Sequence, residues 1–147
     1  MKRSSFDNLP PLSHQEALQI LSTPIGELRM SSDYYKAAFH LARYPGIKTE
    51  DALIHLVQSK SLDQAVLIGR RKAIDTLAKL KCTRSIPIIG NCLHSSDPYL
   101  VEEAAWALKE LNCKDVDLLE KITLLLDDPS QHRRALIKSI SALGYLR

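Results

Sequence analysis

Residues 70–82 read RRKAIDTLAKLKC, and this stretch returns in outline 31 residues later as VEEAAWALKELNC, residues 101–113. One Ala, two Leu and one Cys fall at the same places in both copies. Their apolar residues recur every three or four positions, which is the period of an amphipathic helix. Similar helices at a fixed spacing are typical of repeat folds. We therefore expect stacked helical repeats.

The same apolar pattern extends in both directions along the chain. Shifted back by 36 residues, the first copy falls on Ala37, Ala38, Leu41 and Tyr44. Shifted forward by 35 residues, the second copy falls on Ser139, Ile140, Leu143 and Leu146. Small residues recur where a neighbouring helix approaches closely, and large aliphatic residues recur one turn later. The pattern predicts helices near residues 13–22, 33–43, 49–59, 65–81, 84–94, 98–111, 116–126 and 130–145.

The composition agrees with an all-α fold. The 147 residues include 24 Leu and 13 Ala but only 4 Val, which favours helices and leaves few residues suited to strands. The helices pair into four hairpins, near residues 13–46, 47–82, 83–113 and 114–147, in a single domain that spans residues 13–147. Residues 1–12 are polar and contain two Pro, which predicts a flexible leader before this domain.

The breaks between helices also repeat. Asp97-Pro98 and Asp128-Pro129 each place a capping carboxylate before a Pro at the first helical position, and Asp33 and Asp63 open earlier helices without a Pro. This arrangement resembles HEAT-type repeats. Residues 95–108, SSDPYLVEEAAWAL, are similar to the short HEAT-like repeats of cyanobacterial phycobiliprotein lyase subunits. The resemblance covers roughly residues 31–147 and implies a right-handed α-solenoid of about four helical hairpins.

In such a solenoid the second helix of each hairpin lines the concave wall, and this is where we expect a binding surface. Half of the eight aromatic residues fall on the predicted wall. The candidate site residues are Tyr35, Phe39, Arg71, Lys72, Asp75, Tyr99, Glu102 and Trp106. Two interpretations stay open: the aromatic side chains are exposed anchors for a partner, or Phe39 and Trp106 pack against the leader or a loop.

Charges on the predicted wall invert from one repeat to the next. The basic residues Arg71, Lys72 and Lys79 correspond to Glu102, Glu103 and Glu110. One interpretation is a ladder of ion pairs between repeats, each of which contributes little to stability. The other is that Arg71 and Lys72 meet an acidic partner or a ligand carboxylate. The family's usual Arg is kept at Arg71 and Arg133 but replaced by Glu102, so the sequence does not predict a continuous row of Arg.

Several kinds of chemistry lack a sequence signature. The five Gly are isolated, so the chain has no phosphate-binding loop, and no catalytic motif is found. Cys82, Cys92 and Cys113 have no paired metal-ligand spacing and are expected to be free thiols in the cytoplasm. No apolar run is long enough to span a membrane, and basic residues interleaved with acidic ones argue against nucleic-acid binding.

The main functional prediction is therefore a non-catalytic scaffold or adaptor. It would bind a protein partner through its concave helix face, in phycobilisome assembly or turnover, without a cofactor. The resemblance implies an alternative, a subunit of a phycobiliprotein lyase that binds and attaches a bilin. In that case Tyr35, Phe39, Tyr99 and Trp106 would stack on the tetrapyrrole, and Arg71 or Lys72 would meet its propionates. The apolar stripe runs on to Leu146, which suggests a homodimer or heterodimer through one end of the solenoid.

Overall fold

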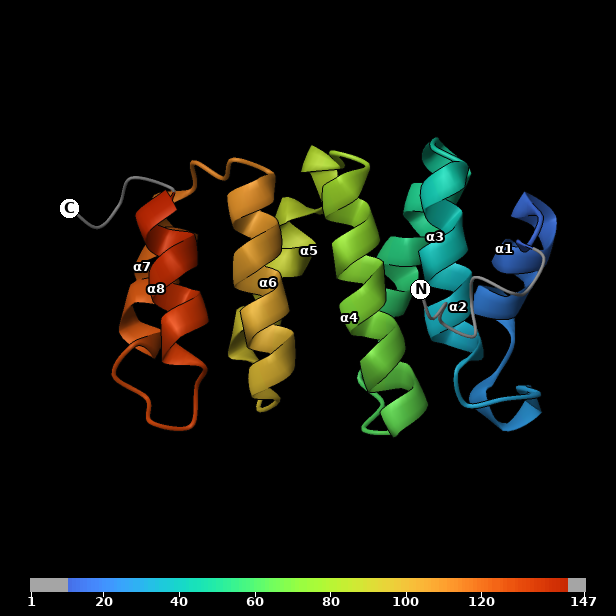
Figure 1. The fold of residues 1–147 in the computed structure, drawn as a ribbon, viewed down its shortest axis with the longest axis horizontal. Coiled ribbons are helices and arrows are strands. Elements are labelled where there is room, and N and C mark those ends of the chain that lie inside the picture. Colours follow the sequence, from blue (N-terminus) through green and yellow to red (C-terminus); the bar gives the residue numbers. More distant parts are fainter. Residues whose placement is uncertain (1–10, 143–147) are drawn as a thin grey trace, which may run out of the picture. The chain divides into compact units, whose positions relative to one another are not determined.

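The structure, a computed structural model, describes residues 11–142. These residues form eight α-helices and four short 3-10 helices, and they contain no strand (Figure 1). The α-helices are α1 (His14–Ser22), α2 (Asp33–His40), α3 (Ile47–Val57), α4 (Gln64–Lys79), α5 (Ile86–Asn91), α6 (Pro98–Glu110), α7 (Val116–Leu125) and α8 (Arg133–Ala142). The prediction of an all-α fold is confirmed.

The chain divides into two compact units at Thr76 and Leu77, within α4. In the first unit α1 packs against α2 and α3, and the guanidinium Nε of Arg70 on α4 donates to the Val57 carbonyl of α3 at 2.9 Å. In the second unit α5 packs against α6, α7 against α8, and α6 against α8. Consecutive helices thus pair as hairpins within each unit.

The predicted apolar stripe forms the core of the second unit. Val101, Ala104, Ala105 and Leu108 are fully buried on α6. Helical periodicity alone would place Cys113 on the opposite, outward side of this helix, with Glu102 and Trp106, but Cys113 is buried. The helix ends at Glu110, so the helical periodicity that placed Cys113 no longer applies there.

Two helix ends share one turn conformation. Lys81 after α4 and Asn112 after α6 both have a φ of 57°. The amides of Cys82 and Cys113 donate back to the carbonyls of Leu77 and Leu108 at 3.0 and 2.9 Å, which is the six-to-one bond of a Schellman motif. This turn folds each Cys back against its own helix, and it explains why the Cys position is repeated.

Carboxylate and hydroxyl caps begin several helices. Ser13 and Glu16 form a reciprocal capping box on α1, and the side chains of Asp63, Asp97 and Asp115 accept amide hydrogen bonds in the first turns of α4, α6 and α7. The predicted cap at Asp128 is wrong. Its carboxylate accepts from the Ser130 amide and hydroxyl in a separate turn, and α8 begins only at Arg133.

The remaining differences are at helix boundaries. The predicted helix 84–94 consists of the 3-10 helix Thr83–Ser85, the short α5 and the 3-10 helix Cys92–His94. Its start shifts because Pro87 lacks an amide hydrogen and fits only the first turn of an α-helix. The helix predicted at 33–43 likewise ends as a 3-10 helix, Leu41–Arg43, and a further 3-10 helix, Ile25–Glu27, was not predicted. Residues 1–10 of the predicted leader and residues 143–145 of the last predicted helix lie outside the described residues.

Candidate functional site

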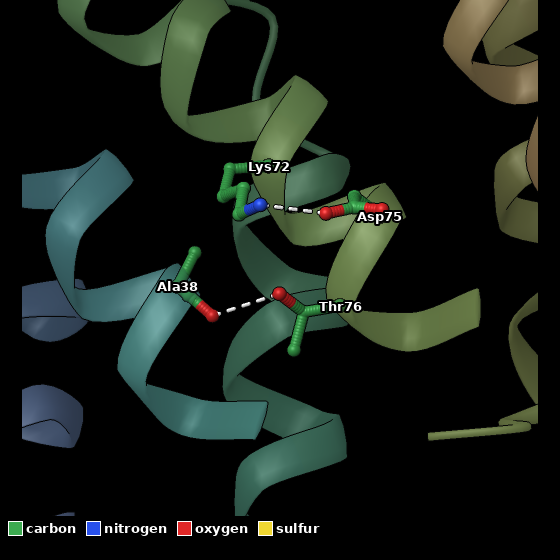
Figure 2. A network of polar contacts seen from close by, with 4 residues as sticks. All are labelled: Ala38, Lys72, Asp75 and Thr76. Atoms are coloured by element: carbon green, nitrogen blue, oxygen red, sulfur yellow. Dashed lines mark hydrogen bonds and ion pairs between the residues drawn. The ribbon is translucent and has the colours of Figure 1, made fainter. Parts of the chain in front are cut away.

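Helices α2 and α4 of the first unit lie close together because Gly69 has no side chain. A Cβ built on Gly69 would come 2.7 Å from the Cβ of Tyr34, so the α4 backbone approaches α2 directly at this point. One and a half to two turns further along α4, the buried hydroxyl of Thr76 donates to the Ala38 carbonyl at 2.8 Å (Figure 2). These two contacts fix which residues of the helices face each other.

Four of the predicted site residues meet where these helices adjoin. The ammonium of Lys72 contacts the Asp75 carboxylate at 2.6 Å, as Figure 2 shows. The same ammonium lies 5.1 Å from the centre of the Phe39 ring and 5.6 Å from that of Tyr35. We call these residues, Tyr35, Phe39, Lys72 and Asp75, the Lys72 cluster.

The Lys72 cluster holds a partly desolvated cation. The side chains of Lys72 and Asp75 are only 14% and 15% exposed. Aromatic ring faces attract a nearby cation, and partial desolvation strengthens that attraction. An ammonium has three donor hydrogens, so Lys72 retains donor capacity beyond its bond to Asp75. The cluster is therefore suited to hold a carboxylate next to an aromatic surface.

A small cavity opens beside this cluster, at the N-terminal ends of α2 and α4. Its volume is about 330 Å³, and its lining residues are Ser31, Ser32, Tyr35, Gln64, Ala65 and Ile68. Tyr35 belongs to both features, because it lines the cavity and also lies beneath the Lys72 ammonium. We call this space the α2–α4 cavity.

The other predicted residue of the first unit is Arg71. It is half-buried on α4, next to Lys72 in the sequence. Successive residues of a helix point about 100° apart, so Arg71 and Lys72 do not present their side chains in one direction. The structure brings the Lys72 ammonium onto the aromatic rings of Tyr35 and Phe39.

In the second unit, Tyr99 and Glu102 meet at a residue that was not among the predicted site residues. Tyr99 is 58% exposed, and its ring contacts the His132 ring edge-on, with 4.5 Å between the centroids. The Nδ1 atom of His132 also contacts a Glu102 carboxylate oxygen. Trp106 lies one turn further along α6 and is half-buried.

The sequence pattern gave no signal for His132. The forward shift of 35 residues aligns His132 with Asp97, outside the matched segment 101–113. The turn before α8 starts the helix at Arg133, so the imidazole comes from that turn and not from the helix. Arg133 and Arg134 are exposed in the first turn of α8. The single concave groove expected to hold all eight site residues stays a prediction.

The three cysteines are buried thiols. None of Cys82, Cys92 and Cys113 forms a disulfide. Burial raises the pKa of the Cys113 thiol above its ordinary value, so the nucleophilic thiolate is disfavoured. Within residues 11–142 no group of three or more metal-ligating side chains comes together, and no described helix has the length and apolar character needed to cross a bilayer.

His40, at the end of α2, is an unusual buried polar residue. It is 2% exposed, and neither ring nitrogen has a hydrogen-bond partner among the described residues. Burial lowers the pKa of His40 below 6.5, and the charges of Arg43 and Lys36 lower it further. Folding therefore favours the neutral imidazole.

We expect His40 to make stability depend on pH. The unfolded chain binds this proton near pH 6.5 and the folded chain only below that, so the free energy of unfolding is highest above pH 6.5. It falls as the pH drops from there through the lowered pKa of the folded state. Urea midpoints at about pH 7.5 and about pH 5 would measure this loss, and His40→Leu should reduce it. An equal loss in His40→Leu would contradict the assignment to His40.

Comparison with known proteins places the chain in a class. Residues 65–143 match the HEAT repeats family. The matched region covers more than half of the chain and includes the hairpins of the second unit together with α4. The chain belongs to the HEAT repeat family.

Within that class, two curated proteins are similar to this chain. The uncharacterized phycocyanin operon protein Y of Pseudanabaena tenuis (strain PCC 7409) is 34% identical over 141 residues, which is 96% of this chain and 33% of that protein. The bilin biosynthesis protein CpeY of Synechococcus sp. (strain WH8020) is 39% identical over 117 residues, 79% of this chain and 28% of that protein. The chain thus spans about a third of the length of these curated relatives or less.

A solved structure shows the same architecture. The complex of CpcE and CpcF of phycocyanin lyase from Nostoc sp. PCC7120 contains a chain that matches 98% of this one, with a TM-score of 0.76 and 27% sequence identity. The match covers 58% of that solved chain. The predicted resemblance to HEAT-like phycobiliprotein lyase subunits is confirmed.

Proposed function

We propose that this chain is part of a phycobiliprotein bilin lyase and that the face formed by α2 and α4 holds the bilin. The similarity to CpeY and to the phycocyanin lyase complex supports this function over the non-catalytic scaffold. The Lys72 cluster is the observation that carries it, because a cation held on two aromatic rings matches a ligand that is both flat and anionic.

The reaction itself needs positioning more than a reactive protein group. The S–H bond of an acceptor cysteine adds across a carbon–carbon double bond of the bilin, so one C–S bond and one C–H bond form, and nothing leaves. Holding the flat ligand in one orientation contributes to such a step by making the encounter intramolecular. In this proposal Tyr35 and Phe39 support the ring system, and Lys72 binds a propionate.

Asp75 has a defined part in the proposed binding. Its carboxylate contacts the Lys72 ammonium at 2.6 Å and so holds the cation above the rings before the ligand arrives. A bilin propionate would then share the ammonium with Asp75, since the ammonium has donors for both. The lysine side chain is therefore already ordered in the free protein, and ligand binding loses less conformational entropy.

We also propose that the chain acts together with a protein partner. The similar solved structure comes from a complex of two proteins, and the curated relatives are about three times as long as this chain. A second HEAT-like chain is the partner that this similarity favours, and docking through one end of the solenoid remains the predicted mode. The cytoplasmic location likewise stays a prediction.

The proposed function is tested by bilin uptake. Coexpression with a bilin source is expected to yield a coloured protein, and added bilin should shift its visible absorbance on binding. Phe39→Ala should weaken binding about fivefold, because a ring contact contributes about 1 kcal/mol beyond its buried area. Ile47→Ala, at an exposed apolar residue of α3, is the matched control and should bind as the unaltered chain does.

A colourless protein that takes up no added bilin would overturn the proposed function. If Phe39→Ala and Ile47→Ala take up bilin equally, the protein still binds bilin, but the face formed by α2 and α4 is not the binding site. Circular dichroism of both variants checks that the helices remain folded.

A further inference from the structure

We infer that the α2–α4 cavity receives one terminal ring of the bilin while the neighbouring propionate binds Lys72. This inference rests on the proposed function and adds the orientation of the ligand. It starts from the position of Tyr35, which lines the cavity and whose ring centre is 5.6 Å from the Lys72 ammonium. Tyr35 therefore connects the cavity to the cation.

The spacing along α4 sets the size of the ligand. Gln64 and Ile68 line the cavity, and Lys72 follows Ile68 by four residues on the same helix face. At 1.5 Å per residue, the Cα atom of Lys72 is about 6 Å along the helix from that of Ile68 and about 12 Å from that of Gln64. The ligand must then carry a carboxylate about one to two helical turns from an end group. In a linear tetrapyrrole the propionates are on the inner rings, each next to a terminal ring.

The lining of the cavity suits a terminal ring. Ala65, Ile68 and the Tyr35 ring offer apolar contacts for alkyl substituents, while Ser31, Ser32 and Gln64 offer hydroxyl and amide groups to the ring lactam. A volume of about 330 Å³ is at the small end of ligand-binding cavities. The cavity thus fits one ring of the ligand, and the other rings extend along the Lys72 cluster.

The charges beside the cavity favour an anionic ligand over a neutral one. Lys72 adjoins the cavity through Tyr35, and its partner Asp75 follows it by three residues along α4, in the direction away from Ile68. In this proposal a carboxylate that approaches from the cavity meets the ammonium before it meets the Asp75 carboxylate. A ligand with a carboxylate gains an ion pair with this ammonium that a neutral ligand does not.

The test compares a bilin with its dimethyl ester, in which both propionates are neutral. The unaltered chain is expected to bind the free acid about tenfold more tightly than the ester, a difference of about 1.4 kcal/mol, because a hydrogen bond to a charged group contributes more than one between neutral groups. Lys72→Met should bind acid and ester equally. Lys48→Met, on the exposed face of α3, is the charge-matched control and should keep the tenfold preference.

The cavity is tested separately by filling it. Ile68 is 39% exposed, so Ile68→Trp is expected to fold and to occupy the cavity with its indole. This variant should bind acid and ester about tenfold more weakly, yet retain the preference for the acid. Ile68→Phe is a smaller filling variant that should show the same pattern to a lesser degree if the indole disturbs α4.

The possible results distinguish the role of Lys72, the role of the cavity and the proposed function. Equal binding of acid and ester by the unaltered chain would overturn the assignment of Lys72 and leave the proposed function standing. Unchanged affinity in both Ile68→Trp and Ile68→Phe would overturn the assignment of the cavity. If neither the acid nor the ester binds to the unaltered chain, the proposed function itself fails.

Discussion

Replacing Leu108 with alanine is expected to lower the free energy of unfolding by about 3 kcal/mol. Leu108 is fully buried on α6, at the centre of the repeated apolar stripe. Truncation removes its apolar contacts and leaves a space that neighbouring helices fill only in part. Urea denaturation followed by circular dichroism measures the change.

The matched control is Leu124→Ala in the same unit. Leu124 is 68% exposed on α7, so the same truncation there should change the free energy of unfolding by less than about 0.5 kcal/mol. Similar losses in the two variants would contradict the assignment of the core to the repeated stripe.

Replacing Gly69 with valine is the second change with a large expected effect, a loss of about 2 kcal/mol in the free energy of unfolding. Any Cβ at this position would come 2.7 Å from the Tyr34 Cβ. Tyr34 cannot easily move away, because it is buried and its hydroxyl donates to the Thr23 carbonyl at 2.5 Å. The helices α2 and α4 must therefore separate, which costs packing energy and opens the Lys72 cluster.

Gly26→Val is the control for this prediction, since no atom lies within 4 Å of a Cβ built on Gly26. Thermal and urea unfolding of the two variants separates the effect of close packing from that of adding a side chain to glycine. Gly69→Val should also weaken bilin binding, whereas Gly26→Val should not. A Gly69→Val protein as stable as Gly26→Val would show that the two helices tolerate separation.

The fold class could be predicted from the sequence because the chain contains repeats, so that one segment can be compared with another. The stripe through Ala104 and Leu108 recurs at fixed spacing, and each recurrence supports the same helix face. The first and last residues of the helices were less predictable, since they depend on which local hydrogen bonds form. At Asp128 the carboxylate binds Ser130 instead of a helix, and at Pro87 the missing amide hydrogen moves a helix start.

The candidate site was predictable only where its residues are on regular helices. Tyr35, Phe39, Lys72 and Asp75 meet because periodicity puts them on facing sides of α2 and α4. His132 was missed because its position depends on the length of an irregular turn, which no periodic pattern encodes. The cavity could not be predicted either, because it results from the close approach of two helices that are far apart in sequence.

The turns at Lys81 and Asn112 have a consequence for how such a chain can lengthen. Both residues have the same φ of 57°, and the residue that follows each makes the same hydrogen bond back to its helix. Residues 82–112, which contain α5 and α6, therefore follow a residue with this φ and end on another. A tandem duplication of this 31-residue segment would join without new strain at its junction. Each duplication of this segment would therefore lengthen the chain by one helical hairpin.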